Sequence, residues 1–242
     1  MSNWQGDGEV ILRSSDLHRG FDTPKGRINV LQGIDLELAR GEMIAILGAS
    51  GVGKTTLLHL LGGLDRPDQG EIYFRDTAYS GLSEAAMASF RNRHVGFVFQ
   101  FHYLLAEFTA LENVMMPLLI AGKSADEAQR RAELLLCDVG LKDRTGHRPA
   151  ELSGGEQQRV AVARALAMEP ELVIADEPSG NLDTETGNEL HKLLVDLNRN
   201  RQTTFLIATH NRPLAEMAHR VVTLKNGPNR IGHNSGESVG LS

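Results

Sequence analysis

The strongest constraint on this chain is a short glycine-rich segment, residues 48–55, with the sequence GASGVGKT. It matches the pattern G-x-x-x-x-G-K-[ST], it follows the continuous apolar run of residues 43–47, and it precedes a helical pattern at residues 55–61. Strand, glycine-rich loop and helix in this order predict a loop that holds phosphate groups. Glycines let successive backbone N–H groups turn toward a phosphate, and the N-terminus of the following helix adds its dipole.

Specific roles follow for the side chains of this loop. Lys54 is expected to reach the β- and γ-phosphates of a nucleotide, and the Thr55 hydroxyl is expected to bind Mg²⁺. The predicted nucleotide contacts in this segment and directly after it are Gly48, Ser50, Gly51, Gly53, Lys54, Thr55 and Thr56.

Two further apolar runs carry polar side chains at their carboxyl ends. Residues 172–175 lead into Asp176 and Glu177, and residues 205–208 lead into Thr209 and His210. Ligands of open parallel sheets bind at this edge. Asp176 is therefore a candidate for the Mg²⁺ shell, and Glu177 for the base that polarises an attacking water. His210 is a candidate for catalysis or for sensing the γ-phosphate, and a structural histidine is the alternative.

A second candidate phosphate site precedes the helical pattern of residues 157–167. Ser153 and Glu156 have the spacing of a capping box, which alone would explain both residues. Gly154 and Gly155, however, would leave N–H groups bare at a helix N-terminus, where an anion can approach closely. Two such ends indicate either two nucleotides per chain or one nucleotide shared between chains, and the spacing does not choose between them.

Composition narrows the class of protein. The chain has 242 residues, with 41% apolar and 23% charged, as in a soluble globular domain. A net charge of −6 provides no positive field for a polyanion, so we expect no nucleic-acid partner. The single cysteine, Cys137, excludes an internal disulfide and lies in the apolar run 134–139, where we expect a small core residue.

The pattern along the chain predicts an α/β fold. Residues 9–47 indicate short strands, residues 43–74 a βαβ rhythm, and residues 125–136 the clearest helix of a mostly helical middle segment. Further predicted elements are a strand at 71–74, a helix at 156–167, and strands at 172–175 and 205–208. We expect one domain over residues 1–228 with an inserted helical lobe at about 101–155, followed by a mobile tail at 229–242 because that segment is polar and glycine-rich.

No segment predicts a membrane span or a secretory signal. The start, MSNWQGDGEV, lacks a basic segment followed by an apolar run, so we expect a cytoplasmic chain. The longest apolar stretch, residues 114–121, contains Pro117 and is far shorter than the roughly 20 residues that a spanning helix needs. Any membrane association is therefore expected to come through another protein.

With these features in place, the chain resembles the nucleotide-binding subunits of ABC transporters over nearly its whole length. The family's motifs occur in order: Walker A at 48–55, a Q-loop at Gln100, the signature LSGGE at 152–156, Walker B at 172–176, a D-loop at 181–183 and a switch histidine at His210. The resemblance implies a P-loop NTPase (RecA-like) core with an N-terminal antiparallel β subdomain and an inserted helical lobe. It also implies ATP and Mg²⁺ as cofactors.

The resemblance further implies a head-to-tail dimer of two identical chains that holds two ATP molecules between them. In that dimer, Gln100 would touch Mg²⁺, Asp183 would bridge the subunits, and the signature residues Ser153, Gly154, Gly155 and Glu156 would contact ATP in trans. Phe21 occupies the place where the family stacks an aromatic ring on adenine, and a core position is the alternative for this residue.

Within the family, the chain is most similar to the ATP-binding subunits of lipoprotein-releasing systems. The supporting stretches are residues 57–65, 96–102, 108–113 and 176–183, although Ser179 stands where threonine is usual and the C-terminal tail departs from the usual ending. This resemblance implies LolC/LolE-like integral membrane permease subunits as partners and a peripheral location on the cytoplasmic face of the bacterial inner membrane. Macrolide-type exporters and the cell-division complex share these stretches and remain alternatives.

Two rivals come from other classes of protein. A soluble ABC ATPase acting on nucleic acid or ribosomes would usually carry two motif sets or a long coiled-coil insertion, and this chain has neither. A P-loop kinase would have no use for the signature, and Glu177 beside Asp176 favours water as the phosphate acceptor.

Overall fold

The chain folds into two compact units. The computed structural model describes residues 8–24, 26–225, 227 and 231–233, so the start of the chain and most of the tail lie outside the described residues. One unit consists of Met1–Gly81 with Leu206–Ser242, and we call it the phosphate-loop unit. The other, Leu82–Phe205, is the helical unit. The boundaries differ from the expected lobe at 101–155, since the helical unit also takes in strands of the parallel sheet.

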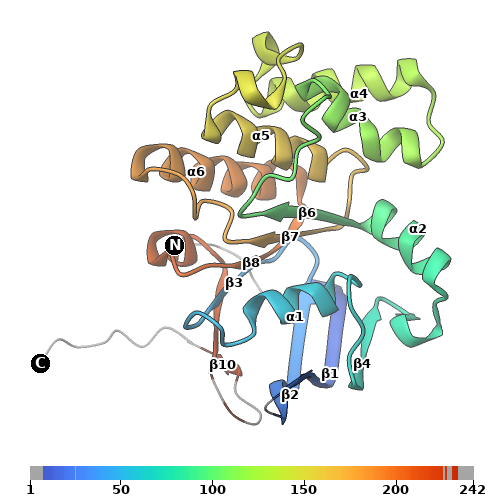
Figure 1. Ribbon diagram of the computed structural model, residues 1–242, viewed down its shortest axis with the longest axis vertical. Helices are drawn as coiled ribbons and strands as arrows, with labels where there is room; N and C mark the ends of the chain where they lie inside the picture. Colours follow the sequence, from blue (N-terminus) through green and yellow to red (C-terminus); the bar gives the residue numbers. More distant parts are fainter. Residues whose placement is uncertain (1–7, 25, 226, 228–230, 234–242) are drawn as a thin grey trace, which may run out of the picture. The chain divides into compact units, whose positions relative to one another are not determined.

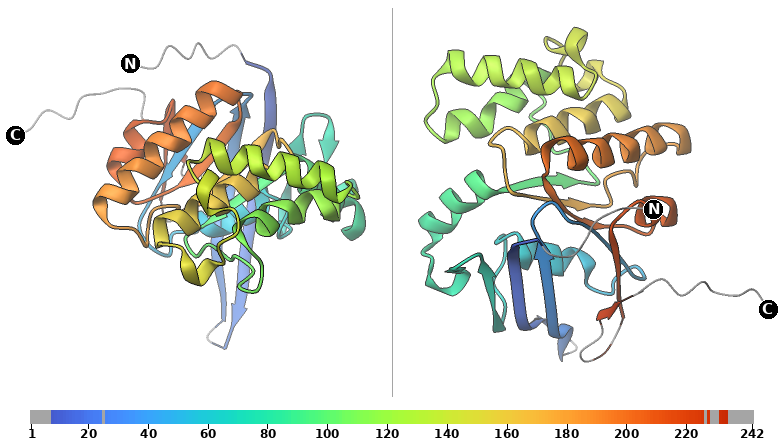
Figure 2. Two further views of the ribbon diagram at one scale, coloured as in Figure 1. Left: turned by 90° about the horizontal axis from the view of Figure 1, so that it is seen from above. Right: turned by 180° about the vertical axis from the view of Figure 1, so that it is seen from behind.

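An antiparallel sheet opens the phosphate-loop unit. Its order is β2-β1-β4-β5, and Figures 1 and 2 show the long ribbons of β1 and β2 side by side. The bounds are β1 Val10–Thr23, β2 Gly26–Ala39, β4 Gln69–Phe74 and β5 Thr77–Ala78. The expectation of several short strands at 9–47 was wrong for this pair, because both strands are 14 residues long and pass through register shifts. Asp16 at φ 49° lies in one such irregularity, which in sequence looks like a turn.

The parallel strands of this unit lead to the phosphate loop. β3 (Met43–Leu47) is almost entirely buried and pairs in parallel with β9 (Arg220–Leu224). The helix α1 (Lys54–Leu61) follows the loop, η1 (Tyr79–Gly81) follows β5, and α7 (Arg212–Glu216) precedes β9. β10 (Ile231–His233) lies within the predicted mobile tail and pairs antiparallel with β9, and the other residues of that tail lie outside the described residues.

The helical unit contains two parallel strands and a group of packed helices. β6 (Val95–Phe99) and β7 (Leu172–Asp176) pair in parallel, and β8 (Thr204–Ala208) crosses into the other unit after Phe205. β6 was not predicted, because Gly96 interrupts its apolar run. A Cβ at Gly96 would lie 2.3 Å from the Ala165 carbonyl oxygen, so this glycine permits the close approach of α5. The remaining elements are α2 Glu84–His94, α3 Ala110–Ile120, α4 Ala125–Asp138, η2 Lys142–Arg144, η3 Pro149–Glu151, α5 Gly154–Ala165 and α6 Thr184–Arg201.

Side-chain caps set where the main helices of this unit begin. Thr109, Ser124, Ser153 and Asp183 each accept a backbone N–H in the first turn of α3, α4, α5 and α6. α3, α4 and α5 pack against one another, as Figures 1 and 2 show. On α4 the buried face includes Leu135 and Leu136, whereas Cys137 is exposed, so the expectation of a core cysteine was wrong. Among the described residues, no helix is both long enough and apolar enough to cross a bilayer.

Candidate functional site

The phosphate loop ends in a helix N-terminus that no side chain caps. Gly53 is the N-cap of α1 with φ 106°, in the left-handed region, and no side-chain hydrogen bond closes this end. A Cβ on Gly53 would lie 2.8 Å from Val30 Cγ1, so glycine is also required sterically. The first backbone N–H groups of a helix lack intrahelical partners, and a phosphate suits them by hydrogen bonding and by charge.

Lys54 reaches back across the same loop. Its ammonium donates hydrogen bonds to the carbonyl oxygens of Gly48 at 2.9 Å and Ala49 at 3.3 Å. Only 9% of Lys54 is exposed, so its charge is held at the loop rather than in open solvent. A triphosphate placed against the N-terminus of α1 would meet this ammonium. The residues present therefore fit the phosphates of a nucleotide.

His210 belongs to the same unit as the loop. It is exposed and follows Thr209, whose N–H donates to the Ile46 carbonyl of β3 at 3.1 Å. β3 ends one residue later and leads directly into the phosphate loop. The structure therefore brings His210 and the loop to the same ends of neighbouring strands, as expected from the sequence.

Phe21 is a surface residue of β1. Its exposed fraction is 42%, which rules out the core position considered as the alternative. The Arg19 guanidinium carbon lies 5.0 Å from the centre of the Phe21 ring. An exposed aromatic ring in the phosphate-loop unit is available for stacking on a flat base.

The helical unit gathers the predicted carboxylates and Gln100 at one sheet end. In the parallel register of β6 and β7, Phe99 is opposite Asp176, so Gln100 and Glu177 both leave their strands at that point. Glu177 adopts φ 47°, a left-handed conformation that is uncommon for a residue with a side chain, and its carbonyl accepts the Gly180 N–H at 2.9 Å. Such backbone outliers concentrate at functional sites.

Gln100 is tied to the D-loop through Asn181. The side-chain amide of Gln100 donates to Asn181 Oδ1 at 3.0 Å, and Asn181 Nδ2 donates to the Gln100 carbonyl at 3.0 Å. A Cβ at Gly180 would lie 3.1 Å from Gln100 Nε2, so the loop passes close to this side chain. Sequence reasoning had not singled out Asn181 as a partner of Gln100, since the two residues are far apart in the chain.

The signature segment has the capping box that its spacing predicted. Ser153 Oγ accepts the Glu156 N–H at 3.2 Å, and Glu156 Oε2 accepts the Ser153 N–H at 2.8 Å. The hydrogen bonds from Ser153 and the nearby Arg144 guanidinium lower the pKa of Glu156. Gly154 is exposed at the start of α5, whereas Gly155 is buried against Thr186 of α6.

Asp183 serves as the N-cap of α6. Its Oδ1 accepts the N–H groups of Glu185 and Thr186 at 3.0 Å each, and its Oδ2 accepts the Thr186 hydroxyl at 2.6 Å. The side-chain bond from Thr186, followed by the backbone bonds, lowers the pKa of Asp183. Its carboxylate is therefore ionised and oriented at an exposed helix end.

Sequence reasoning also missed the anchor between the Q-loop segment and α5. The Arg164 guanidinium donates to the carbonyls of Tyr103 at 2.7 Å and His102 at 2.8 Å. Burial lowers the pKa of His102, so this ring is neutral at neutral pH. The long sequence separation of these residues explains why no local pattern predicted the anchor.

The predicted site residues thus fall into two groups. The phosphate-loop unit holds Phe21, the whole glycine-rich loop with Lys54, Thr55 and Thr56, and His210. The helical unit holds Gln100, Asp176, Glu177, the signature residues and Asp183. The candidate Mg²⁺ residue Thr55 belongs to one group, and Gln100 and Asp176 belong to the other.

This chain is a P-loop nucleotide-binding protein. The features that define the class are a buried strand, a glycine-rich loop, a helix N-terminus without a side-chain cap and a lysine that reaches back over the loop. Within that class, the family model described as ABC transporter matches residues 31–180. The chain belongs to this family.

Curated relatives match almost end to end. The lipoprotein-releasing system ATP-binding protein LolD of Idiomarina loihiensis is 50% identical over 219 residues, which cover 90% of this chain and 96% of the relative. The LolD protein of Geobacter metallireducens is 54% identical over 217 residues, with 90% and 96% covered.

Solved structures confirm the α/β P-loop fold. The dimeric post-hydrolysis structure of the ATP-binding cassette MJ0796 with ADP and Pi has a TM-score of 0.84 at 35% identity, covering 93% of this chain and 100% of that one. The structure of cbiO1 from Clostridium perfringens has a TM-score of 0.79 at 31% identity, covering 90% and 86%.

Proposed function

We propose that this chain is the ATP-hydrolysing subunit of an ABC transporter that releases lipoproteins from the inner membrane toward the outer membrane. The observation that carries the proposal is the P-loop with its complete set of ABC motifs, in a chain about half identical to LolD proteins over 90% of its length. The reaction converts ATP and water to ADP and phosphate, and the motion that follows drives transport.

Within the proposed reaction, the chain's residues bind, orient and accept protons. The N–H groups of the phosphate loop and α1, with Lys54, hold the β- and γ-phosphates. Thr55, Gln100 and Asp176 would hold Mg²⁺, which neutralises charge on the phosphates when bound. Glu177 polarises the attacking water, and His210 contacts the γ-phosphate. Positioning and charge stabilisation dominate, because phosphoryl transfer requires little covalent chemistry from the protein.

A second copy of the chain completes each site in this proposal. Ser153, Gly154, Gly155 and Glu156 would face the nucleotide held by the other copy, with Asp183 between the two chains. Gly154 is exposed at the N-terminus of α5, which supports an anion contact from outside the chain. The MJ0796 cassette, at 35% identity, was solved as a dimer.

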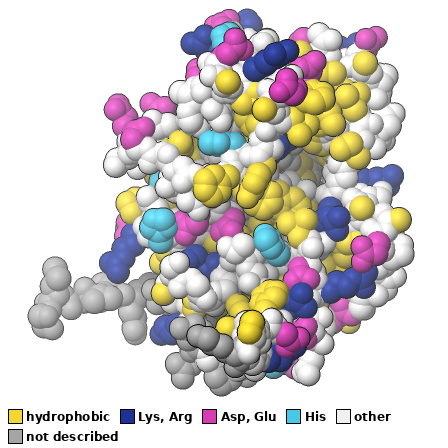
Figure 3. Space-filling model, viewed as in Figure 1, with side chains coloured by type: hydrophobic (Ala, Val, Ile, Leu, Met, Phe, Trp, Pro, Cys, Tyr) yellow, Lys and Arg dark blue, Asp and Glu magenta, His cyan; other side chains and the backbone are white. Residues whose placement is uncertain are grey.

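The partner in the membrane would bind the helical unit. Large apolar side chains are exposed there, and Figure 3 shows yellow side chains gathered where Figure 1 draws α3. The exposed large apolar residues of the helical unit include Phe101, Tyr103, Leu105 and Phe108 before α3 and Leu119 and Ile120 within it. Exposed apolar surface of this kind suits protein binding. We propose that LolC/LolE-like permease subunits cover it, which places the chain peripherally on the cytoplasmic face of the inner membrane.

A pull-down tests the assembly. Tagged Glu177→Gln would be bound to detergent-solubilised membranes in the presence of ATP, with Lys54→Ala as the matched control that cannot hold nucleotide. Recovery of two membrane proteins with few spans and large periplasmic domains is the expected result. A single permease would instead indicate a macrolide-type or division-type system. Recovery of ribosomes or DNA would contradict the transporter proposal.

A further inference from the structure

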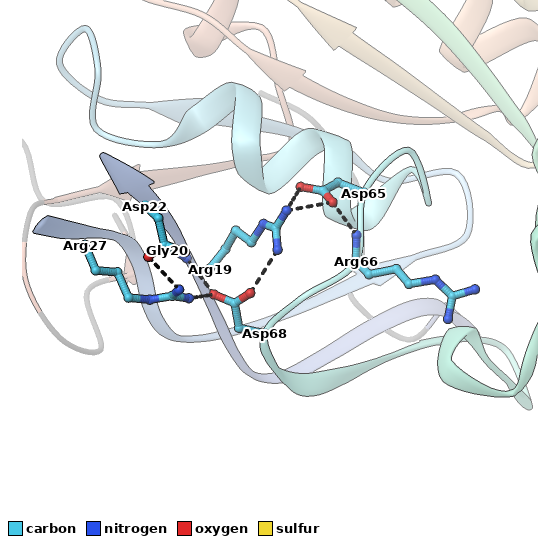
Figure 4. A network of polar contacts seen from close by, with 7 residues as sticks. All are labelled: Arg19, Gly20, Asp22, Arg27, Asp65, Arg66 and Asp68. Carbon is cyan, nitrogen blue, oxygen red and sulfur yellow. Dashed lines mark hydrogen bonds and ion pairs between the residues drawn. The ribbon is translucent and has the colours of Figure 1, made fainter. Parts of the chain in front are cut away.

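Arg19 lies at the centre of an ion-pair network beside Phe21. Its guanidinium donates to Asp68 Oδ1 at 2.9 Å and pairs with Asp65 Oδ2 at 2.8 Å, as Figure 4 shows. Its side chain is only 23% exposed. Arg19 Nε is buried and has no hydrogen-bond partner among the described residues, so both Asp contacts use the terminal nitrogens.

Asp68 fixes the backbone of β1 as well as the Arg19 side chain. Asp68 Oδ2 accepts the Gly20 N–H at 2.8 Å, and the Asp68 N–H donates to the His18 carbonyl at 2.8 Å. Arg27 also pairs with Asp68. The Gly20 bond, followed by the arginines, lowers the pKa of Asp68, which keeps this carboxylate ionised at neutral pH.

Asp65 and Asp68 also connect α1 to the strand β1 of the phosphate-loop unit. They follow α1, the helix whose N-terminus forms part of the phosphate loop. The Asp65 N–H donates to the His59 carbonyl in the last turn of α1 at 3.3 Å. The network therefore links the phosphate-binding helix to the strand that carries Phe21.

We propose that Arg19 is a positioning residue for the adenine base: Asp65 and Asp68 clamp its guanidinium against one face of Phe21, and the base stacks on the other face. This inference rests on the assignment of Phe21 as the adenine platform in the proposed function. A guanidinium 5.0 Å from the ring centre is within the range of a cation–π contact. It restricts the rotamers of an otherwise exposed ring, so less side-chain entropy is lost when the base binds.

Calorimetric titration with two ligands separates this role from a general structural one. A non-hydrolysable ATP analogue carries both base and phosphates, whereas inorganic tripolyphosphate carries the phosphates alone. Each would be titrated into the full chain carrying Arg19→Met, Phe21→Leu or both changes. The matched control is Arg13→Met, because Arg13 makes a similar contact with Tyr73, at 4.9 Å, in the same sheet.

Arg19→Met is expected to weaken binding of the ATP analogue about fivefold, or about 1 kcal/mol, and to leave tripolyphosphate binding unchanged. Phe21→Leu should weaken the analogue about tenfold or more, since a stacked base contributes about 1–3 kcal/mol. In the Phe21→Leu background, adding Arg19→Met should weaken binding of the ATP analogue by less than about a further twofold, because Arg19 acts on the base through the Phe21 ring. Arg13→Met should change neither affinity. The ratio of the two affinities within one variant does not depend on how much of the protein is folded.

Three results would overturn the proposal, and they separate it from the function on which it rests. If Arg19→Met weakens both ligands equally, Arg19 supports the fold and not the base. If Phe21→Leu weakens the analogue and Arg19→Met does not, the Arg19 role is wrong while the stacking assignment stands. If Phe21→Leu leaves the analogue unaffected, the stacking assignment itself is wrong and the Arg19 role is lost with it.

Discussion

Gln100 and Asn181 exchange two hydrogen bonds, each 3.0 Å long, that join the end of β6 to the loop after β7. Asn181→Ala removes both bonds and releases the Gln100 side chain. We expect ATP turnover to fall about fivefold, the equivalent of about 1 kcal/mol in the barrier, with little change in ATP affinity. Steady-state phosphate release over a range of ATP concentrations measures both quantities.

The control for Asn181 is another exposed amide in the same unit. Gln129 donates to Glu133 at 2.8 Å on the surface of α4 and contacts no predicted site residue. Gln129→Ala should leave turnover at the wild-type rate. Equal turnover in Asn181→Ala and Gln129→Ala would show that the Gln100 contact has no catalytic consequence.

Gly155 marks the closest approach of α5 and α6. A Cβ at this position would lie 2.3 Å from Thr186 Cγ2, so Gly155→Ala forces the helices apart or displaces Thr186. We expect the free energy of unfolding to fall by about 1–3 kcal/mol, as in other overpacked cores. Urea denaturation, followed by circular dichroism, measures the loss.

Two further variants check this steric explanation. At Gly154 the nearest atom to an added Cβ is 3.7 Å away, so Gly154→Ala should change stability by about 0.5 kcal/mol or less. Adding Thr186→Ser to Gly155→Ala removes the clashing methyl group and keeps the hydroxyl that bonds Asp183, which should restore most of the lost stability. No recovery in the double variant would refute the clash with Thr186 as the cause.

His191 makes stability depend on pH. Its ring is buried, with Nε2 2.8 Å from Ser179 Oγ, and burial lowers its pKa in the folded state. Below an unfolded-state pKa of about 6.5, the unfolded chain then binds more protons than the folded one, so stability falls as the pH decreases. Thermal unfolding between pH 7.5 and pH 5 should show a steeper loss for the wild type than for His191→Gln. The pKa of His102 is also lowered by burial, but His102 contributes equally to both proteins. Parallel curves would therefore contradict His191 as a source of the pH dependence.

Apolar periodicity and the glycine pattern predicted the elements whose conformation depends on neighbouring residues in the sequence. The apolar run of β3, the glycines of the loop and the start of α1 each depend on neighbouring residues, and the prediction there was confirmed within a residue. β1 and β2 were harder to predict, because irregularities in their register look like turns. The strand at residues 231–233 was missed because its polar segment is ordered by pairing with β9.

The same distinction applies to the site. Residue types and motif order predicted the candidate site residues, including Lys54 and Glu177, and the capping box of Ser153 with Glu156. They could not predict partners brought together by tertiary structure, such as Asn181 for Gln100 or Asp68 for Arg19. These contacts depend on how strands and helices pack. Their partners are far apart in the sequence, so no local pattern predicts them.

The most direct test of the account is the rate of phosphate release by Glu177→Gln at saturating ATP, compared with the wild type. Glu177 leaves the end of β7 in a left-handed conformation and is assigned as the group that polarises water. We predict that the wild type hydrolyses ATP, and that the variant still binds ATP but releases phosphate about a hundredfold more slowly or worse. Turnover by Glu177→Gln at the wild-type rate would contradict the assignment of this site as the hydrolytic centre.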